Sequence, residues 1–258
     1  MSSPASIAPI LMALDTSTDR IHAALSVGAT VHALDLPGGA QASASLLPAL
    51  QGLLSQAGQT WADVDAIAFG RGPGAFTGLR TACSVTQGLA LALACPVIAL
   101  DTLMAVAEHA RQAAPDTLAA GDLVWVLQDA RMDELYVGAY RWDGAHWQQE
   151  QAAQLWSLDE PLHRWAPEGV IQAGVRWAGN ALRAYPDKLA ALQHAQWLPH
   201  GAPALPAGHA LAELAQRAWQ QGDTLDAALA LPLYVRDKVA QTTAERQAAK
   251  DAAGASGA

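Results

Sequence analysis

The sequence predicts an α/β protein made of two similar lobes, each with its elements in the order βββαβα. Three observations lead to this prediction. The chain has 258 residues, which is long for a single domain and suits two tightly joined lobes. A strand, a glycine-rich turn, a helix and a second strand follow one another in the first half, and a strand-turn-strand pattern occurs in both halves. Apolar residues make up 52% of the chain, which is enough for a sizeable core.

The first lobe opens with a predicted hairpin. The segment from Ile7 to Ala13 is apolar and bounded by polar residues, and Ile21, Ala23 and Leu25 alternate with more varied neighbours. Both patterns are typical of strands. The polar residues from Asp15 to Asp19 lie between the two strands and form what we call the first turn.

A helix is predicted after this hairpin. Ser43 or Ser45 can cap its start, Pro48 is tolerated only near its first turn, and Gly58 ends it. The apolar residues that recur at helical spacing are Leu46, Leu47, Leu50, Leu53, Leu54 and Ala57.

A parallel βαβ unit follows. A short buried strand is predicted from Ala66 to Phe69, then a glycine-rich turn from Gly70 to Gly74, and then a helix from about Phe76 to Leu93. The segment from Val97 to Leu100 is the next strand, and Leu103 to Ala113 is a further helix.

The second half repeats the hairpin of the first. We expect lobes at residues 1–114 and 115–240, a helix over 211–221, and a disordered tail over 241–258, where no large apolar residue occurs. Duplication of a strand-turn-strand unit explains the repeat, although so short a match also arises by chance. The positions that align without gaps are Asp15, Asp19, Ile21, Ala23 and Ala24 with Asp129, Asp133, Leu135, Val137 and Gly138.

Charge and cysteine content exclude several classes of protein. The formal net charge is -9 and the Lys and Arg residues are scattered, so we expect no independent binding of nucleic acid. The N-terminus has no basic residues before its apolar run, and the uncharged stretch from Thr81 to Leu100 is interrupted by polar residues and Pro96. We therefore expect a cytoplasmic protein with no membrane segment, in which Cys83 and Cys95 are reduced core thiols.

The first turn and the glycine-rich turn are the candidates for nucleotide binding. Asp15, Thr16 and Ser17 supply the carboxylate and hydroxyl groups that hold a magnesium nucleotide, and Gly72 and Gly74 precede a helix as in phosphate-binding loops. A self-capped hairpin turn and a structural glycine turn explain the same residues. The matching turn of the second half, which begins at Asp129, has no hydroxyl groups, so a two-sided phosphate clamp is incomplete.

No catalytic residues and no metal ligands are predicted. The eight histidines are not spaced as ligands on one helix, and no Gly-x-Ser-x-Gly elbow occurs. The helix from Phe76 to Leu93 is apolar around most of its circumference, so we expect it to pack on its own sheet and on something else. The predicted partner interface of this helix and the preceding one consists of Leu46, Leu50, Leu53, Leu79, Cys83 and Ala90.

Several motifs resemble the TsaB (YeaZ) family of threonylcarbamoyladenosine biosynthesis proteins. The most specific is the string from Phe69 to Arg80, and the match is strongest before Thr102. The chain departs from the family at Ala42, where a histidine is common. The supporting strings are Leu14-Asp15-Thr16-Ser17-Thr18, Gln87-Gly88-Leu89-Ala90, Asp129-Ala130-Arg131-Met132-Asp133-Glu134-Leu135-Tyr136 and Tyr234-Val235-Arg236.

The resemblance implies a duplicated actin-like fold of the ASKHA, ribonuclease H-like class. It also implies a non-catalytic scaffold for the catalytic subunit TsaD that works with the ATPase TsaE, as threonylcarbamoyl passes from its adenylate to tRNA adenosine. A homodimer is implied when the chain is alone, with tRNA contacted only through the complex. No cofactor is expected in this subunit, and ADP or ATP belongs to the assembled complex. The alternative is an actin-like ATPase or kinase that uses the turn at Asp15.

Overall fold

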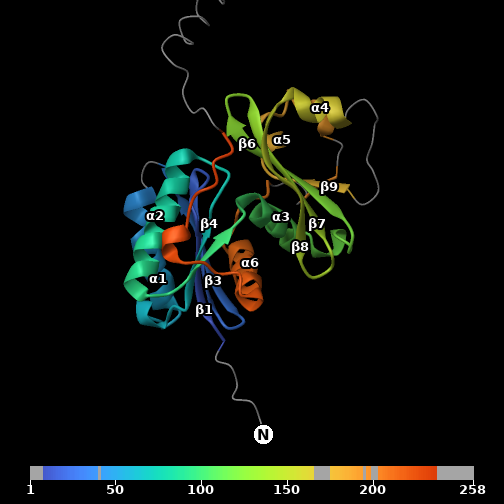
Figure 1. Ribbon diagram of the computed structural model, residues 1–258. Coiled ribbons are helices and arrows are strands. Elements are labelled where there is room, and N and C mark those ends of the chain that lie inside the picture. Colours follow the sequence, from blue (N-terminus) through green and yellow to red (C-terminus); the bar gives the residue numbers. More distant parts are fainter. Residues whose placement is uncertain (1–7, 40–41, 166–174, 194–195, 199–202, 237–258) are drawn as a thin grey trace, which may run out of the picture.

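The computed structural model describes residues 8–39, 42–165, 175–193, 196–198 and 203–236, which form two lobes side by side (Figure 1). The predicted tail over 241–258 lies outside the described residues. Each lobe has a five-stranded sheet, with the order β3-β2-β1-β4-β5 in the first and β10-β9-β6-β7-β8 in the second. When the second order is read from β8 to β10, its strands correspond one by one to those of the first order read from β3 to β5. The two lobes therefore share one topology. This arrangement is the predicted duplicated actin-like α/β fold.

On one side of each sheet, neighbouring strands are antiparallel and form hairpins, and on the other side neighbouring strands are parallel. Those of the first lobe are β1 (Ile10–Asp15), β2 (Arg20–Val27), β3 (Thr30–Pro37), β4 (Ala66–Gly70) and β5 (Val97–Leu100). Those of the second lobe are β6 (Leu123–Arg131), β7 (Glu134–Trp142), β8 (Trp147–Ser157), β9 (Val175–Ala178) and β10 (Trp197–Leu198).

Two helices cover the outer face of the first sheet. They are α1 (Ala42–Gln56) and α2 (Phe76–Leu93), and the bounds of α2 are those predicted. Apolar residues that alternate along β1 and β2, such as Met12 and Ile21, pack beneath them. Helix α1 begins at Ala42, one residue before Ser43, so the serine caps expected for this helix are not its start.

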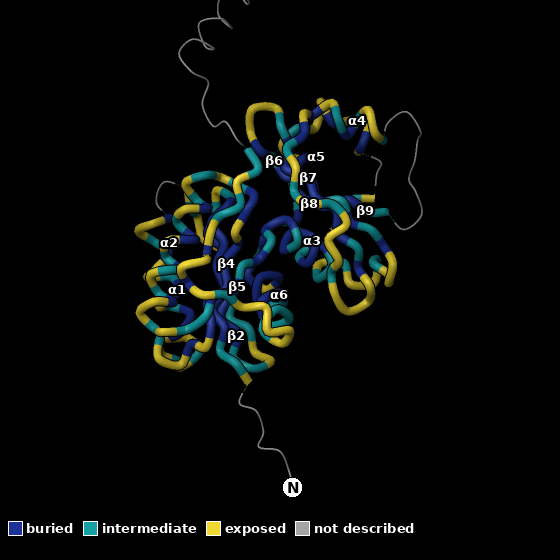
Figure 2. The backbone as a smooth tube through the Cα atoms, viewed as in Figure 1, coloured by how far each residue is buried: buried dark blue, intermediate teal, exposed yellow. Residues whose placement is uncertain are grey.

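The lobes exchange helices. Helix α3 (Thr102–Ala113) follows the first sheet along the chain but packs its Leu103 and Val106 against the second sheet. Helix α6 (Gly208–Gln221) follows the second sheet but packs Leu211 and Leu214 against the first. Both helices therefore lie between the sheets, where Figure 2 shows α3 as largely buried. The predicted lobe boundary at residues 114 and 115 lies between α3 and β6.

The far face of the second sheet is covered by α4 (Asp159–Trp165) and α5 (Ala181–Ala184). Its core is aromatic, since the Trp165 ring lies 5.1 Å from the Trp125 ring and 5.8 Å from the Trp177 ring. No helix in the described part of the chain is long and apolar enough to cross a membrane.

The last described segment, Leu225–Arg236, is called the strap here. It begins beside the C-terminal end of α2, where the amide of Leu225 donates to the carbonyl oxygen of Val97 at 2.8 Å. It reaches the other end of the helix where the amide of Leu233 donates to the carbonyl oxygen of Arg71 at 2.7 Å. The strap thus runs along α2 in the opposite direction and then continues to the second lobe (Figure 1).

Candidate functional site

The first turn uses its polar groups internally. The Asp15 carboxylate is fully buried, accepts from the Ser17 amide at 2.7 Å and accepts from the Thr102 hydroxyl at 2.9 Å. The Thr16 hydroxyl donates to the carbonyl oxygen of Gly78 at 2.7 Å. Burial raises the pKa of Asp15, because a charged carboxylate is costly away from water. Asp15 and Thr16, which were predicted to help hold a nucleotide, therefore already have partners in the protein, whereas the Ser17 Oγ atom is buried with no hydrogen-bond partner among the described residues.

The glycine-rich turn packs directly on the first turn. At Gly74, a Cβ atom would lie 2.5 Å from the Cβ of Ser17, a distance that leaves no room for a side chain. At Gly72 the φ angle is +118°, and the amide donates to the Thr102 hydroxyl at 3.1 Å. Glycine is therefore required here for a close approach and a left-handed backbone. The structural reading of this turn explains both positions without a ligand.

The second turn, Asp129–Asp133, copies the hydrogen bonding of the first. The Asp129 carboxylate accepts from the amide two residues on, that of Arg131, at 2.7 Å, as Asp15 does in the first turn. It also accepts from the Tyr185 hydroxyl at 2.7 Å and pairs with the Arg131 guanidinium at 3.2 Å. The hydrogen bond from the aspartate to the amide two residues on is thus repeated, but the backbone is not, since φ is positive at Arg131, Met132 and Asp133 and not at the aligned residues 17–19.

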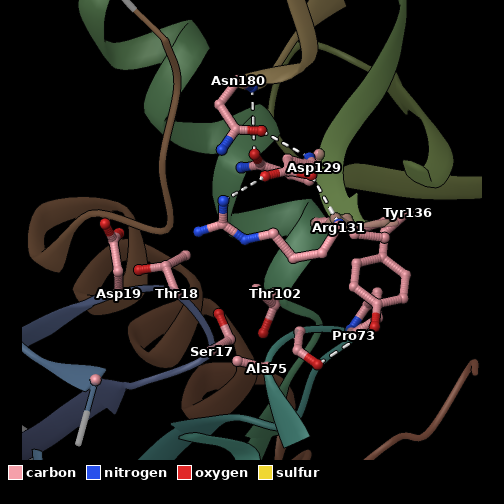
Figure 3. Close-up of a pocket in the computed structure, with 15 residues that line it drawn as sticks. Ser17, Thr18, Asp19, Pro73, Ala75, Thr102, Asp129, Arg131, Tyr136 and Asn180 are labelled. Carbon is pink, nitrogen blue, oxygen red and sulfur yellow. Dashed lines mark hydrogen bonds and ion pairs between the residues drawn. The ribbon is translucent and has the colours of Figure 1, made fainter. Parts of the chain in front are cut away.

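A cavity of about 270 Å³ lies between the two turns. Figure 3 shows the turns facing each other across it, with the Arg131 side chain reaching between them. Of the five predicted nucleotide-binding residues, Ser17 and Gly74 line this cavity, whereas Asp15, Thr16 and Gly72 do not. The Tyr136 hydroxyl closes one side by donating to the carbonyl oxygen of Gly74 at 3.4 Å. Ser17 and Thr18 of the first turn line the cavity, and the second turn, which has no hydroxyl groups, presents the Arg131 side chain to it.

The predicted partner-interface residues are not on the surface of the chain. All six lie in the core of the first lobe, at exposures of 0–6%. Our assignment of these side chains to an outward face is therefore wrong for the isolated chain. The residues corrected are Leu46, Leu50, Leu53, Leu79, Cys83 and Ala90.

The strap explains the error. The Cys83 thiol and the Gln87 amide both donate to the carbonyl oxygen of Ala230, each at 3.0 Å. The apolar side of α2, which we expected a partner to cover, is thus covered by the strap of the same chain. The sequence did single out Tyr234-Val235-Arg236 at the end of the strap, but nothing in its local pattern indicated that it lies on α2.

What α1 and α2 do expose is a nearly uncharged surface, which we call the helical face. A groove between the helices is lined by residues that include Ser43, Thr77, Ser84 and Val85. Arg80 is the single charged residue of the two helices. The exposed residues are Ser43, Ala44, Leu47, Pro48, Gln51, Ser55 and Gln56 of α1 and Thr77, Arg80, Ser84, Gly88, Leu91 and Ala92 of α2.

Metal ligands and reactive thiols do not gather in the part of the chain that the structure describes. No group of three or more His, Cys, Asp or Glu residues there is placed to hold a metal ion. Cys83 and Cys95 are free, and burial raises the pKa of each thiol, so both favour the protonated form.

Known proteins resemble this chain along most of its length. The protein of Escherichia coli (strain K12) described as tRNA threonylcarbamoyladenosine biosynthesis protein TsaB is 32% identical over 235 residues, which cover 89% of this chain and 96% of that protein. The TsaB protein of Haemophilus influenzae is 32% identical over 240 residues. It is covered over 94% of its length, and this chain over 89%.

Structural similarity points the same way. A solved structure described as YeaZ from Pseudomonas aeruginosa matches with a TM-score of 0.74 and 34% identity, covering 88% of this chain and 99% of that one. Residues 39–244 match the family described as TsaD, tRNA N6-adenosine threonylcarbamoyltransferase. A Neisseria meningitidis protein of that description shares 45% identity over 58 residues, which cover 22% of this chain and 16% of that protein. The chain therefore belongs to the TsaB (YeaZ) family of tRNA threonylcarbamoyladenosine biosynthesis proteins.

Proposed function

We propose that this chain is a non-catalytic scaffold subunit of the complex that transfers threonylcarbamoyl from threonylcarbamoyl-adenylate to tRNA adenosine next to the anticodon. Its relatives are named for the biosynthesis of this modified nucleoside. The proposal that the chain is non-catalytic is supported by the first turn. Asp15 is buried there, accepts hydrogen bonds from Ser17 and Thr102, and does not line the cavity. A nucleotide-hydrolysing site needs that carboxylate near its metal ion.

The helical face supports the scaffold role. A surface formed by two neighbouring helices, with small and apolar residues and one charge, loses little on desolvation when a partner covers it. Leu47 is 45% exposed and Leu91 is 71% exposed, and both lie on this face. We propose that the face binds the catalytic TsaD subunit in the complex and a second copy of this chain when the chain is alone.

Other parts of the proposal follow from charge and from the resemblance. With a net charge of -9, the chain contacts tRNA only through the complex, because few phosphates can be neutralised by its scattered basic residues. TsaE joins as a further partner, and the subunit has no cofactor of its own, with ADP or ATP bound in the assembled complex. The location of the complex is the cytoplasm.

Ser84→Arg tests the helical face. Ser84 is exposed near the middle of α2, so the substitution places a long charged side chain on the face without disturbing the core. The matched control is Ser157→Arg, the same change at an exposed position of β8 in the second lobe. We expect the first variant to lose co-purification with TsaD and the second to keep it, with equal thermal stability for both.

Two results would overturn the proposal in separate ways. Retention of TsaD binding by Ser84→Arg would exclude the helical face while leaving the scaffold role intact. Modification of tRNA by this chain without TsaD, or ATP turnover abolished by Asp15→Ala, would exclude the scaffold role and favour the actin-like ATPase or kinase.

A further inference from the structure

The end of the strap is attached to the first lobe at the start of α2. The Tyr234 ring packs on the Phe76 ring with 4.8 Å between their centroids. The Tyr234 hydroxyl accepts from the Arg80 guanidinium at 3.1 Å, and that guanidinium also lies 3.8 Å from the centre of the Phe76 ring. Stacking, a hydrogen bond and a cation-π contact therefore hold this one side chain.

Two residues later the same segment is attached to the second lobe. The Arg236 guanidinium donates to the carbonyl oxygen of Ala130 at 2.9 Å and to that of Arg131 at 3.2 Å. It also pairs with the Glu134 carboxylate at 2.5 Å, and the Arg236 side chain is only 12% exposed. Hydrogen bonds from a charged donor are among the stronger contacts in proteins. Arg236 thus binds both strands of the β6–β7 hairpin around its turn.

That turn has an unfavourable backbone. Arg131, Met132 and Asp133 follow one another with φ angles of +64°, +57° and +58°, and none of them is glycine. Each left-handed residue of this kind costs about 1–2 kcal/mol. Such conformations persist where surrounding contacts enforce them, and the carbonyl oxygens that Arg236 binds lie at the entrance to this run.

The segment also forms the wall of a cavity. A second space, of about 210 Å³, adjoins the one between the turns and shares Gly74, Arg131 and Tyr136 with it. The strap residues from Leu233 to Arg236 line this second space. Moving the segment away would therefore remove one wall of the second space and open it further to solvent along the junction of the lobes.

We propose that Tyr234-Val235-Arg236 is an interlobe latch: it ties the N-terminal end of α2 to the second turn, holds that turn in its left-handed conformation and closes the junction between the lobes. Tyr234 is the anchor on the first lobe, and Arg236 is the hook on the second. This role accounts for a motif that the proposed scaffold function does not use, and it does not depend on that function.

Trypsin reports on the latch directly, because the bond after Arg131 lies inside the held turn. A protease cleaves the locally opened form, so the cleavage rate follows the population of that form. We expect Arg236→Ala to raise the rate of cleavage between Arg131 and Met132 at least tenfold, with the cut located by mass spectrometry. The matched control is Arg164→Ala, which removes another arginine-glutamate pair, 2.7 Å to Glu160, in α4. This control should leave the rate unchanged.

The anchor is tested with Tyr234. Tyr234→Ala removes the ring contact with Phe76 and should open the turn as Arg236→Ala does. Tyr234→Phe keeps the ring, and its cleavage rate should stay within about fivefold of the wild type, because a single hydrogen bond at an exposed site contributes about 1 kcal/mol or less. Unchanged cleavage at Arg131 in both alanine variants would overturn the latch.

Hydrogen exchange distinguishes local loosening of the turn from a general loss of stability in the variant. If the segment is a latch, its loss in Arg236→Ala lowers the protection of the β6–β7 hairpin and of the strap, while the β1–β2 hairpin keeps its protection. An equal loss of protection in both hairpins of Arg236→Ala would mean that Arg236 contributes only to global stability, and the proposal would be wrong.

Discussion

Leu50 and Leu47 of α1 give a matched test of which side of this helix faces the core. Leu50 is fully buried, whereas Leu47, three residues earlier, is 45% exposed. The same substitution, leucine to alanine, removes the same three carbon atoms at both positions. The sequence alone placed Leu50 on a partner interface, so the test also decides between that interpretation and the structure.

The magnitudes follow from burial. At Leu50 the lost transfer free energy is about 0.8 kcal/mol per carbon, or about 2.4 kcal/mol, and the cavity left under α1 brings the loss to about 3–4 kcal/mol. At Leu47 only about half of the transfer free energy is lost, because the side chain is half exposed, and no cavity forms. Alanine also has a slightly higher helix propensity, so the loss in unfolding free energy is about 1 kcal/mol or less.

Urea unfolding followed by far-ultraviolet circular dichroism measures both values, provided that the slope with urea is unchanged. Co-purification with TsaD gives the complementary result, because Leu47→Ala should weaken binding while Leu50→Ala acts only through stability. Losses in stability that agree within about 0.5 kcal/mol, or a larger loss at Leu47, would refute the orientation of α1 described above.

Three further predictions concern buried groups. Glu108→Ala removes a fully buried carboxylate from part-buried arginine, glutamine and tryptophan donors and should cost about 3–5 kcal/mol in urea unfolding. The exposed pair lost in Glu150→Ala should cost less than about 1 kcal/mol. Gly78→Ala places a Cβ 1.8 Å from a carbonyl oxygen and should lower the melting temperature sharply, whereas Gly88→Ala, with open space around it, should raise stability by up to about 1 kcal/mol. Burial raises the pKa of Asp15 in the folded state, so above the pKa of the unfolded state the ionisation of Asp15 favours unfolding. The stability of Asp15→Asn relative to the wild type should therefore rise as the pH increases from 4 to 8. A difference in stability that does not change with pH would contradict this.

Local patterns were sufficient for most elements of the first lobe, but β3, at Thr30–Pro37, was expected only as a third strand and was not located. The bounds of α2 could be predicted because a glycine turn precedes it and a proline-bounded strand follows it, and the repeat of Asp15 in Asp129 indicated the second turn. Which sheet a helix covers could not be predicted, since α3 and α6 carry ordinary amphipathic patterns that fit either lobe.

The interface was misassigned for a related physical reason. Apolar residues around α2 show that the helix is covered on several sides, but hydrophobicity does not say whether the cover is another chain or a distant part of the same one. Here Ala230, 147 residues after Cys83, supplies the cover. The residues left for a partner are the uncharged small ones, such as Ser84, which have no distinctive pattern in the sequence.

The glycine-rich string of α2 also shows why a motif and its ligand need separate arguments. A phosphate-binding loop leaves backbone amides free to face its ligand. In this protein the amide of Ala75 donates to the carbonyl oxygen of Ser17 at 2.7 Å, and that of Gly72 donates to the Thr102 hydroxyl at 3.1 Å. The glycines let a turn, a strand end and two helix starts meet at backbone distance, so selection for close packing alone can preserve the string. The presence of the string is therefore no argument for a bound phosphate in this protein.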